Sequence, residues 1–201
     1  METKVVGFNS KELIEAITTN QVVCFPTETV YGMGVVYDSL DAFNELVKTK
    51  ERKPDKPFTL MLDNPSLVKE YAYVNEKIEK LILKYMPGEI TLLLRPKEDI
   101  YPWVKLDSKY VGIRVSGKEE VCSLISKVGK PMLVTSANIS GQKVCEDFNE
   151  TYGVFKGKVP YIVKGNTSSN TPSTIVICDE ELILVREGSI KFEEIKKVWE
   201  E

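Results

Sequence analysis

The chain has 201 residues, which suits a single domain with a sizeable hydrophobic core. Its 42% hydrophobic and 28% charged residues are ordinary for a soluble globular protein, and its net charge of −3 argues against a general nucleic-acid binder. The sequence contains no histidine, which excludes Ser-His-Asp and Cys-His catalysis and histidine-bound metals. Any enzymatic activity must therefore depend on cations, hydroxyls, carboxylates and the positioning of substrates.

The sequence shows no sign of export or membrane insertion. Its first residues lack the apolar core of a signal peptide, and no apolar run is long enough to span a bilayer. The four cysteines are widely spaced without a Cys-x-x-Cys pair, so we expect them to be reduced and not to bind a metal. These features predict a cytoplasmic protein.

Short β-like runs alternate with amphipathic helices along the chain. The patterns predict helices over residues 11–19, 40–49, 65–72, 75–85, 119–129 and 192–201. They predict strands over residues 21–25, 58–62, 89–95, 110–115, 131–136, 159–165, 173–180 and 182–188. This alternation predicts a single α/β domain, residues 1–201, with a twisted mixed β-sheet and flanking helices.

Polar residues follow the first predicted strand in the stretch "FPTETVYGMG", residues 25–34. Its Gly-x-Gly lacks the third glycine of a dinucleotide-binding motif. The stretch can be a simple turn that uses proline and glycine, or the wall of a binding site in which Thr27, Thr29 and Tyr31 face a ligand.

Two cations follow the predicted helix 40–49, at Lys50 and Arg52. They can be the basic residues that the helix macrodipole favours at a C-terminus. Alternatively they form a clamp, in which lysine supplies a mobile charge and arginine a planar fork for phosphate or carboxylate. If they form a clamp, we expect alanine at either position to reduce activity while the fold remains stable, because helix-end cations contribute little to stability.

Two further strand ends carry polar groups. The strand 131–136 runs into Thr135, Ser136 and Asn138, at the position where ligands sit in open α/β sheets. Ser173 opens a later strand and Arg186 closes the next, so a hairpin would place both on one side. The loop-like residues 165–173 before this hairpin are either a flap or a simple connection.

The polar residues of these four stretches supply hydroxyls, an amide, lysine and arginine. Together these groups suit an anionic, phosphate-bearing ligand.

The motifs resemble those of the YrdC-like family, the L-threonylcarbamoyladenylate synthases, in order and over roughly residues 10–192. The matching stretches are "FPTETVYGMG", Lys50-Glu51-Arg52, Pro87-Gly88-Glu89-Ile90-Thr91, Ile113-Arg114, Ser136 to Gly141, Ser173-Thr174 and Leu184 to Gly188.

The resemblance implies a sheet around a large, concave, positively charged cavity. It implies a nucleotidyltransferase that joins L-threonine, bicarbonate or CO₂, and ATP into threonylcarbamoyl-AMP and pyrophosphate. The product supplies the group placed on the tRNA adenosine next to the anticodon by downstream transfer machinery. Mg²⁺ would enter with ATP, held through the phosphates, and no tightly bound cofactor or protein metal site is implied.

The resemblance also implies roles for individual residues. Lys50 and Arg52 would be catalytic and would offset phosphate charge. The threonine or carbamate would bind to Thr27, Thr29, Tyr31, Arg114 and Thr135. The nucleotide would bind to Lys50, Arg52, Ser136, Asn138, Ser173 and Arg186. The residue that accepts the proton of the threonine amine is not evident, and Glu28 is the nearest carboxylate in sequence.

The sequence departs from the family pattern where many members carry histidine, for example at Met61. Family roles assigned to histidine therefore do not transfer. Two other functions stay open. The chain can be a relative that forms another carbamoyl-adenylate, or a non-catalytic RNA- or tRNA-binding module, although no aromatic stacking run accompanies the basic residues 48–56.

Overall fold

The computed structural model describes residues 1–53, 55–169 and 171–201, so Pro54, and Asn170 within the stretch 165–173, lie outside the described residues. Its strands form one mixed ten-stranded sheet in the order β1-β8-β2-β3-β7-β4-β6-β5-β9-β10. The strands are β1 (Lys4–Val6), β2 (Val23–Pro26), β3 (Tyr31–Val36), β4 (Thr59–Leu62), β5 (Ile90–Leu94), β6 (Val111–Val115), β7 (Met132–Ser136), β8 (Tyr161–Val163), β9 (Thr174–Cys178) and β10 (Leu182–Arg186). The predicted α/β class with a mixed sheet is confirmed.

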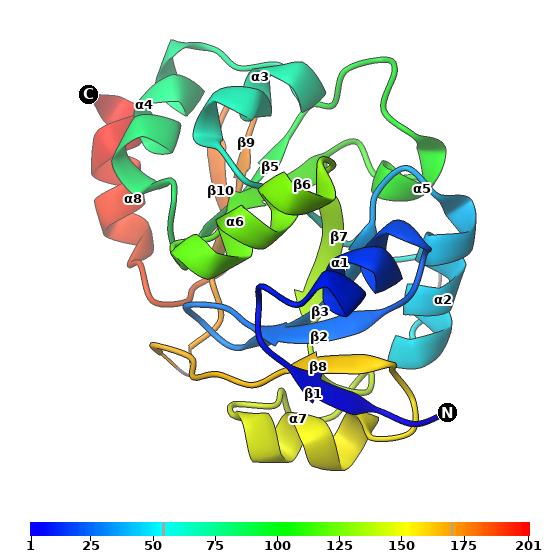
Figure 1. The fold of residues 1–201 in the computed structure, drawn as a ribbon. Coiled ribbons are helices and arrows are strands. Elements are labelled where there is room, and N and C mark those ends of the chain that lie inside the picture. Colours follow the sequence, from blue (N-terminus) through cyan, green and yellow to red (C-terminus); the bar gives the residue numbers. More distant parts are fainter. Residues whose placement is uncertain (54, 170) are drawn as a thin grey trace.

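Helices flank this sheet. Figure 1 shows α1 and α6 side by side in front of the central strands, α4 beside the C-terminal α8, and α7 next to the β1–β8 edge. The helical elements are α1 (Lys11–Thr18), α2 (Leu40–Lys50), the 3₁₀ turn η1 (Pro65–Leu67), α3 (Val68–Tyr71), α4 (Glu76–Tyr85), α5 (Pro102–Lys105), α6 (Glu119–Val128), α7 (Phe148–Phe155) and α8 (Phe192–Glu200). Within the described part of the chain, no helix has the length and apolar character needed to cross a membrane.

Local sequence signals explain where the first helices begin and end. Ser10 caps α1 by accepting a hydrogen bond from the backbone N–H of Leu13, and Ser39 caps α2 in the same way through Ala42. At the end of α2, Glu51 adopts the left-handed conformation with φ of 52°. This turn directs the chain out of the helix toward the sheet, and it sets the position of Arg52.

The sequence patterns did not predict β3, because its glycines and polar neighbours are typical of a turn. The turn is confined to residues 27–30, and β3 pairs antiparallel with β2 and with β7. A Cβ atom at Gly34 would lie 2.9 Å from the carbonyl oxygen of Leu133, so the close approach of β3 and β7 requires glycine there. The polar residues of the stretch 25–34 therefore lie in a tight hairpin within the sheet.

Candidate functional site

A cavity of about 250 Å³ opens over strands β3 to β7 and β9. Three arginines and seven Ser or Thr residues line it, and among the described residues no Asp or Glu belongs to its lining. Apolar side chains such as Val30, Phe58 and Ile175 complete the walls. The arginine and hydroxyl lining consists of Arg52, Arg114, Arg186, Thr27, Thr29, Thr59, Thr91, Thr135, Ser136 and Ser173.

The β2–β3 hairpin presents two buried hydroxyls to this cavity. Thr27 donates its hydroxyl hydrogen to the carbonyl of Val30 at 2.7 Å and closes the turn. The two threonine hydroxyls lie 2.9 Å apart, and Thr29 accepts a hydrogen bond from Arg114 at 2.9 Å. The only consistent assignment is that Thr29 donates to Thr27, which fixes both hydroxyls and orients the guanidinium beside them.

Arg114, on β6, is held by the hairpin. Its Nη2 donates to Glu28 Oε1 at 2.6 Å as well as to Thr29, and its side chain is 9% exposed. Its Nε atom is buried and has no hydrogen-bond partner in the described structure. A buried unpaired donor is costly, so this N–H is available to an oxygen of a bound ligand.

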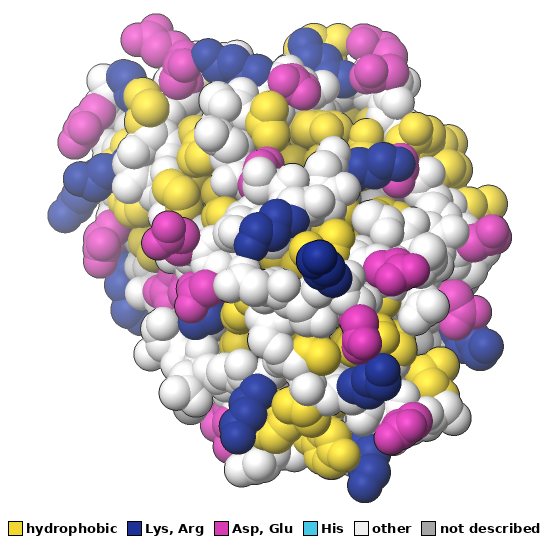
Figure 2. All heavy atoms as spheres, viewed as in Figure 1, with side chains coloured by type: hydrophobic (Ala, Val, Ile, Leu, Met, Phe, Trp, Pro, Cys, Tyr) yellow, Lys and Arg dark blue, Asp and Glu magenta, His cyan; other side chains and the backbone are white. Residues whose placement is uncertain are grey.

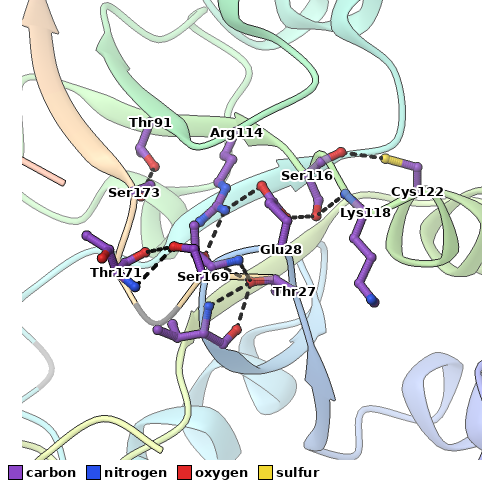
Figure 3. Close-up of polar contacts among 12 residues, drawn as sticks. Thr27, Glu28, Thr91, Arg114, Ser116, Lys118, Cys122, Ser169, Thr171 and Ser173 are labelled. Carbon is purple, nitrogen blue, oxygen red and sulfur yellow. Dashed lines mark hydrogen bonds and ion pairs between the residues drawn. The ribbon is translucent and has the colours of Figure 1, made fainter. Parts of the chain in front are cut away.

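The Glu28 carboxylate lies among hydrogen-bond donors (Figure 3), and Glu28 is not one of the residues that line the cavity. Besides Arg114, it accepts a short hydrogen bond from the Ser116 hydroxyl and one from the backbone N–H of Gly117. Burial alone would raise the pKa of Glu28, but the Arg114 charge and these hydrogen bonds outweigh it and lower the pKa below its ordinary value. Glu28 is therefore an ionised structural partner, and a poor proton acceptor at neutral pH.

Arg52 enters the cavity from the end of α2. Its Nη2 donates to the carbonyl of Pro57 at a long 3.3 Å, and its Cζ lies 5.1 Å from the centre of the Phe58 ring. Burial lowers the pKa of Arg52, and its buried Nε has no partner among the described residues. Like Arg114, this guanidinium retains unused hydrogen-bonding capacity.

Arg186 forms the opposite wall with Ser173, and the predicted hairpin is confirmed because β9 and β10 are antiparallel. Arg186 donates through Nη2 and Nε to the carbonyl of Ser173 at 2.8 and 3.2 Å. The Ser173 hydroxyl lies 3.0 Å from that of Thr91 on β5. Desolvation and then the charge of Arg114, which lines the same cavity, lower the pKa of Arg186.

Lys50 and Asn138 are joined to one another and do not line the cavity. Lys50 is 3% exposed, and its ammonium donates to the carbonyls of Ser136 and Asn138 at 2.6 and 3.2 Å and to Asn138 Oδ1 at 2.8 Å. Burial, and next the charge of Arg52, lower the pKa of Lys50 to about 8. Lys50 is therefore buried between α2 and the end of β7, and its ammonium is engaged by that segment.

Tyr31 also uses its polar group within the protein. The side chain is fully buried, and its hydroxyl lies 3.0 and 2.8 Å from the carbonyls of Val163 and Gly165. It accepts the backbone N–H of Gly165 at 3.2 Å. Burial raises the pKa of Tyr31 to about 12. Tyr31 lines the cavity, but its hydroxyl anchors the segment after β8.

Nine of the eleven residues predicted for the site line the cavity, and Lys50 and Asn138 do not. Their individual roles in binding stay predictions. The prediction did not include Thr59 or Thr91, although Thr91 belongs to the Pro-Gly-x-x-Thr motif and could have been found from it. The nine are Thr27, Thr29, Tyr31, Arg52, Arg114, Thr135, Ser136, Ser173 and Arg186.

The fold and the site define an α/β protein with a cavity lined by arginines and hydroxyls. The family model Sua5_yciO_yrdC, described as "Telomere recombination", matches residues 15–188. The chain belongs to this family.

Two similar curated proteins carry the same activity name. A threonylcarbamoyl-AMP synthase of Buchnera aphidicola is 32% identical over 168 residues, which are 82% of this chain and 90% of that protein. A putative threonylcarbamoyl-AMP synthase of Methanocaldococcus jannaschii is 32% identical over 196 residues, which are 96% of this chain and 90% of that protein.

Solved structures share the fold. Sua5 of P. abyssi, complexed with L-threonine, superposes with a TM-score of 0.91 at 27% identity over 98% of this chain. This chain spans 61% of the length of that protein. E. coli YciO has a TM-score of 0.83 at 23% identity over 92% of this chain and 91% of its own, and this likeness concerns the fold alone.

Proposed function

We propose that this protein is a threonylcarbamoyl-AMP synthase, which forms threonylcarbamoyl-AMP and pyrophosphate from L-threonine, bicarbonate or CO₂, and ATP. The observation that carries the proposal is the convergence of Arg52, Arg114 and Arg186 on one hydroxyl-lined cavity. Relatives that match most of the chain bear this activity name, and a structure with the same fold holds L-threonine.

The chemistry proceeds in two steps. The threonine nitrogen attacks the carbon of CO₂, or of bicarbonate with loss of water, and loses a proton to give a carbamate. A carbamate oxygen then attacks the α-phosphorus of ATP, and the bond to the β-phosphate oxygen breaks, releasing pyrophosphate. Both steps bring anions together, which is unfavourable unless fixed cations offset their charge. Arginines already held in place supply that charge without reorganisation.

The three arginines differ in their partners, and this difference suggests how the substrates are oriented. Arg114 forms an ion pair with Glu28, whereas Arg52 and Arg186 form none with the described residues. We therefore place the phosphates against Arg52 and Arg186, where positive charge is not offset. The less highly charged amino-acid end lies against Arg114, whose unpaired Nε would satisfy a carboxylate or carbamate oxygen.

The hydroxyl groups of the cavity would likewise divide between the amino-acid end and the nucleotide. Thr27, Thr29 and Thr135 would line the threonine end beside Arg114, with the ring of Tyr31 as a wall. Ser136 and Ser173 would contact the nucleotide. Lys50 would act by fixing the backbone around Ser136 and Asn138, since its three donor hydrogens already serve that segment.

Magnesium would arrive with ATP. The cavity lining offers hydroxyls and no carboxylate among the described residues, and those residues contain no group of three His, Cys, Asp or Glu that could hold a metal ion. This donor set suits Mg²⁺ that is bound mainly through phosphate oxygens and water. The product would pass to the downstream tRNA threonylcarbamoyl-transfer machinery in the cytoplasm.

Pyrophosphate release with ATP, bicarbonate and single amino acids tests the proposal. We expect release that requires bicarbonate and prefers threonine. Release that prefers another carbamoyl donor or amine indicates the related carbamoyl-adenylate chemistry. No release, together with a rise in melting temperature caused by RNA and not by ATP with threonine, indicates the RNA-binding module. The face shown in Figure 2 has basic and acidic side chains interspersed, so it offers RNA no extended basic surface.

A further inference from the structure

Glu28 connects two parts of the candidate site that are far apart in the sequence (Figure 3). We propose that Glu28 is a positioning residue that sets the affinity for threonine, because its side chain fixes the guanidinium of Arg114. This inference rests on the proposed function and adds a residue to it, since Glu28 itself is not part of the cavity lining.

The side chain of Glu28 holds one end of Arg114. Oε1 accepts the Nη2–H of Arg114 at 2.6 Å, Oε2 accepts the hydroxyl of Ser116, and Gly117 donates its backbone N–H to the carboxylate. Both oxygens are thus engaged by donors. Arg114 is fixed through Nη2 by Glu28 and Thr29, and its remaining buried donor, Nε–H, has no partner in the described structure.

The main chain of Glu28 makes a separate connection. Its carbonyl accepts the backbone N–H groups of Ser168 and Ser169 at 3.2 and 2.9 Å. The same segment continues to Ser173, which lines the cavity and is bound by Arg186. A substitution at position 28 retains this carbonyl, so it changes only the link to Arg114.

Glutamine at position 28 would disturb Arg114 without removing volume. The carboxylate of Glu28 meets only donors, from Arg114, Ser116 and Gly117. An amide group must direct its NH₂ either at the Arg114 guanidinium or at the Ser116 hydroxyl. The first choice opposes two donors, and the second removes the oxygen that accepts the Ser116 hydroxyl hydrogen. Either way the charge that restrains Arg114 is lost.

The test is a comparison of steady-state kinetics for Glu28→Gln and wild-type protein, with pyrophosphate release as the readout. We expect the KM for threonine to rise by at least about tenfold, because the misoriented Arg114 binds the carboxylate poorly. The KM for ATP should change by less than about twofold. Asp38→Asn is the matched control, since it removes the 2.5 Å ion pair with Lys130, neither partner of which lines the cavity, and it should leave both KM values unchanged.

A double-mutant cycle tests whether Glu28 acts through Arg114. If it does, Glu28→Gln should add less than about a twofold effect on the threonine KM in an Arg114→Ala background. Should Glu28→Gln fail to fold, Ser116→Ala serves instead, because it removes one hydrogen bond to the carboxylate and keeps the charge. Ser116→Ala should also raise the threonine KM, by a smaller factor than Glu28→Gln.

Three results would overturn the inference. They are an unchanged threonine KM in Glu28→Gln, equal increases in the KM of both substrates, and a full additional effect of Glu28→Gln in the Arg114→Ala background. Each requires an active wild-type protein. If the wild-type protein shows no threonine-dependent pyrophosphate release, the proposed function fails first and the inference falls with it.

Discussion

Replacing Lys50 by methionine tests whether this lysine is a structural support. Methionine keeps an unbranched apolar stem of similar length and removes the ammonium that contacts Ser136 and Asn138. Lys48→Met is the matched control, because Lys48 lies on the same helix with a side chain that is 78% exposed. Both variants remove one positive charge near the C-terminus of α2.

The expected loss of stability follows from the hydrogen bonds. Asn138 Oδ1 keeps the Ser136 hydroxyl at 2.8 Å, so two backbone carbonyls lose the lysine as donor. Unpaired buried carbonyls cost about 1–3 kcal/mol each, and part of this is recovered because a desolvated ammonium is no longer buried. We expect Lys50→Met to lower the free energy of unfolding by about 2 kcal/mol, a fall of about 4–8 °C in Tm, and Lys48→Met to lower it by less than about 0.5 kcal/mol.

The pH dependence gives a second signature. The pKa of Lys50 is about 8 in the folded protein and near 10.5 when unfolded, so between these values the unfolded chain binds more protons. Wild-type stability should therefore rise with pH across this window relative to Lys50→Met. Urea unfolding at several pH values measures both effects. If Lys50→Met unfolds like Lys48→Met and yet loses pyrophosphate release, Lys50 serves the ligand directly and the structural reasoning is wrong.

Two other substitutions separate structural roles from substrate contacts. Tyr31→Phe removes the hydroxyl that anchors Gly165, so it should lower the free energy of unfolding by about 1–3 kcal/mol. The threonine KM should stay close to wild type. A large rise in that KM with unchanged stability would contradict the structural role of the Tyr31 hydroxyl. Gly188→Ala places a Cβ atom in a clash with the carbonyl oxygen of Pro172, so the backbone at Pro172 and Ser173, just before β9, must shift. We expect a higher KM for ATP and a lower Tm, and normal values of both would show that the wall at Ser173 is not fixed as described.

Local patterns predicted much of the fold because they depend on neighbouring residues. The helices predicted over residues 11–19, 40–49 and 75–85 agree closely with α1, α2 and α4. Strand β3 could not be predicted in this way, since its glycines are typical of a turn. The strand forms because it pairs with β7, which lies about a hundred residues later in the chain. The close approach of the two strands explains the glycine at position 34.

In the candidate site too, contacts between residues far apart in the sequence could not be predicted. Motif order predicted most of the residues that line the cavity, yet it could not show which polar groups are free. Lys50 and Glu28 each find their main partner 86 residues away, in Ser136 and Arg114. A helix-end lysine beside an arginine is typical of a phosphate clamp, and only the tertiary structure shows that its ammonium is already fully engaged.

The most direct test of the proposed activity is to follow the carbon of bicarbonate into the product. Wild-type protein is incubated with ATP, L-threonine and either ordinary or ¹³C-labelled bicarbonate, and the nucleotide products are identified by mass spectrometry. We expect threonylcarbamoyl-AMP whose mass increases by the single labelled carbon, formed together with pyrophosphate. A threonine-dependent adenylate without the label, or no adenylate in the presence of all three substrates, would contradict the proposed activity.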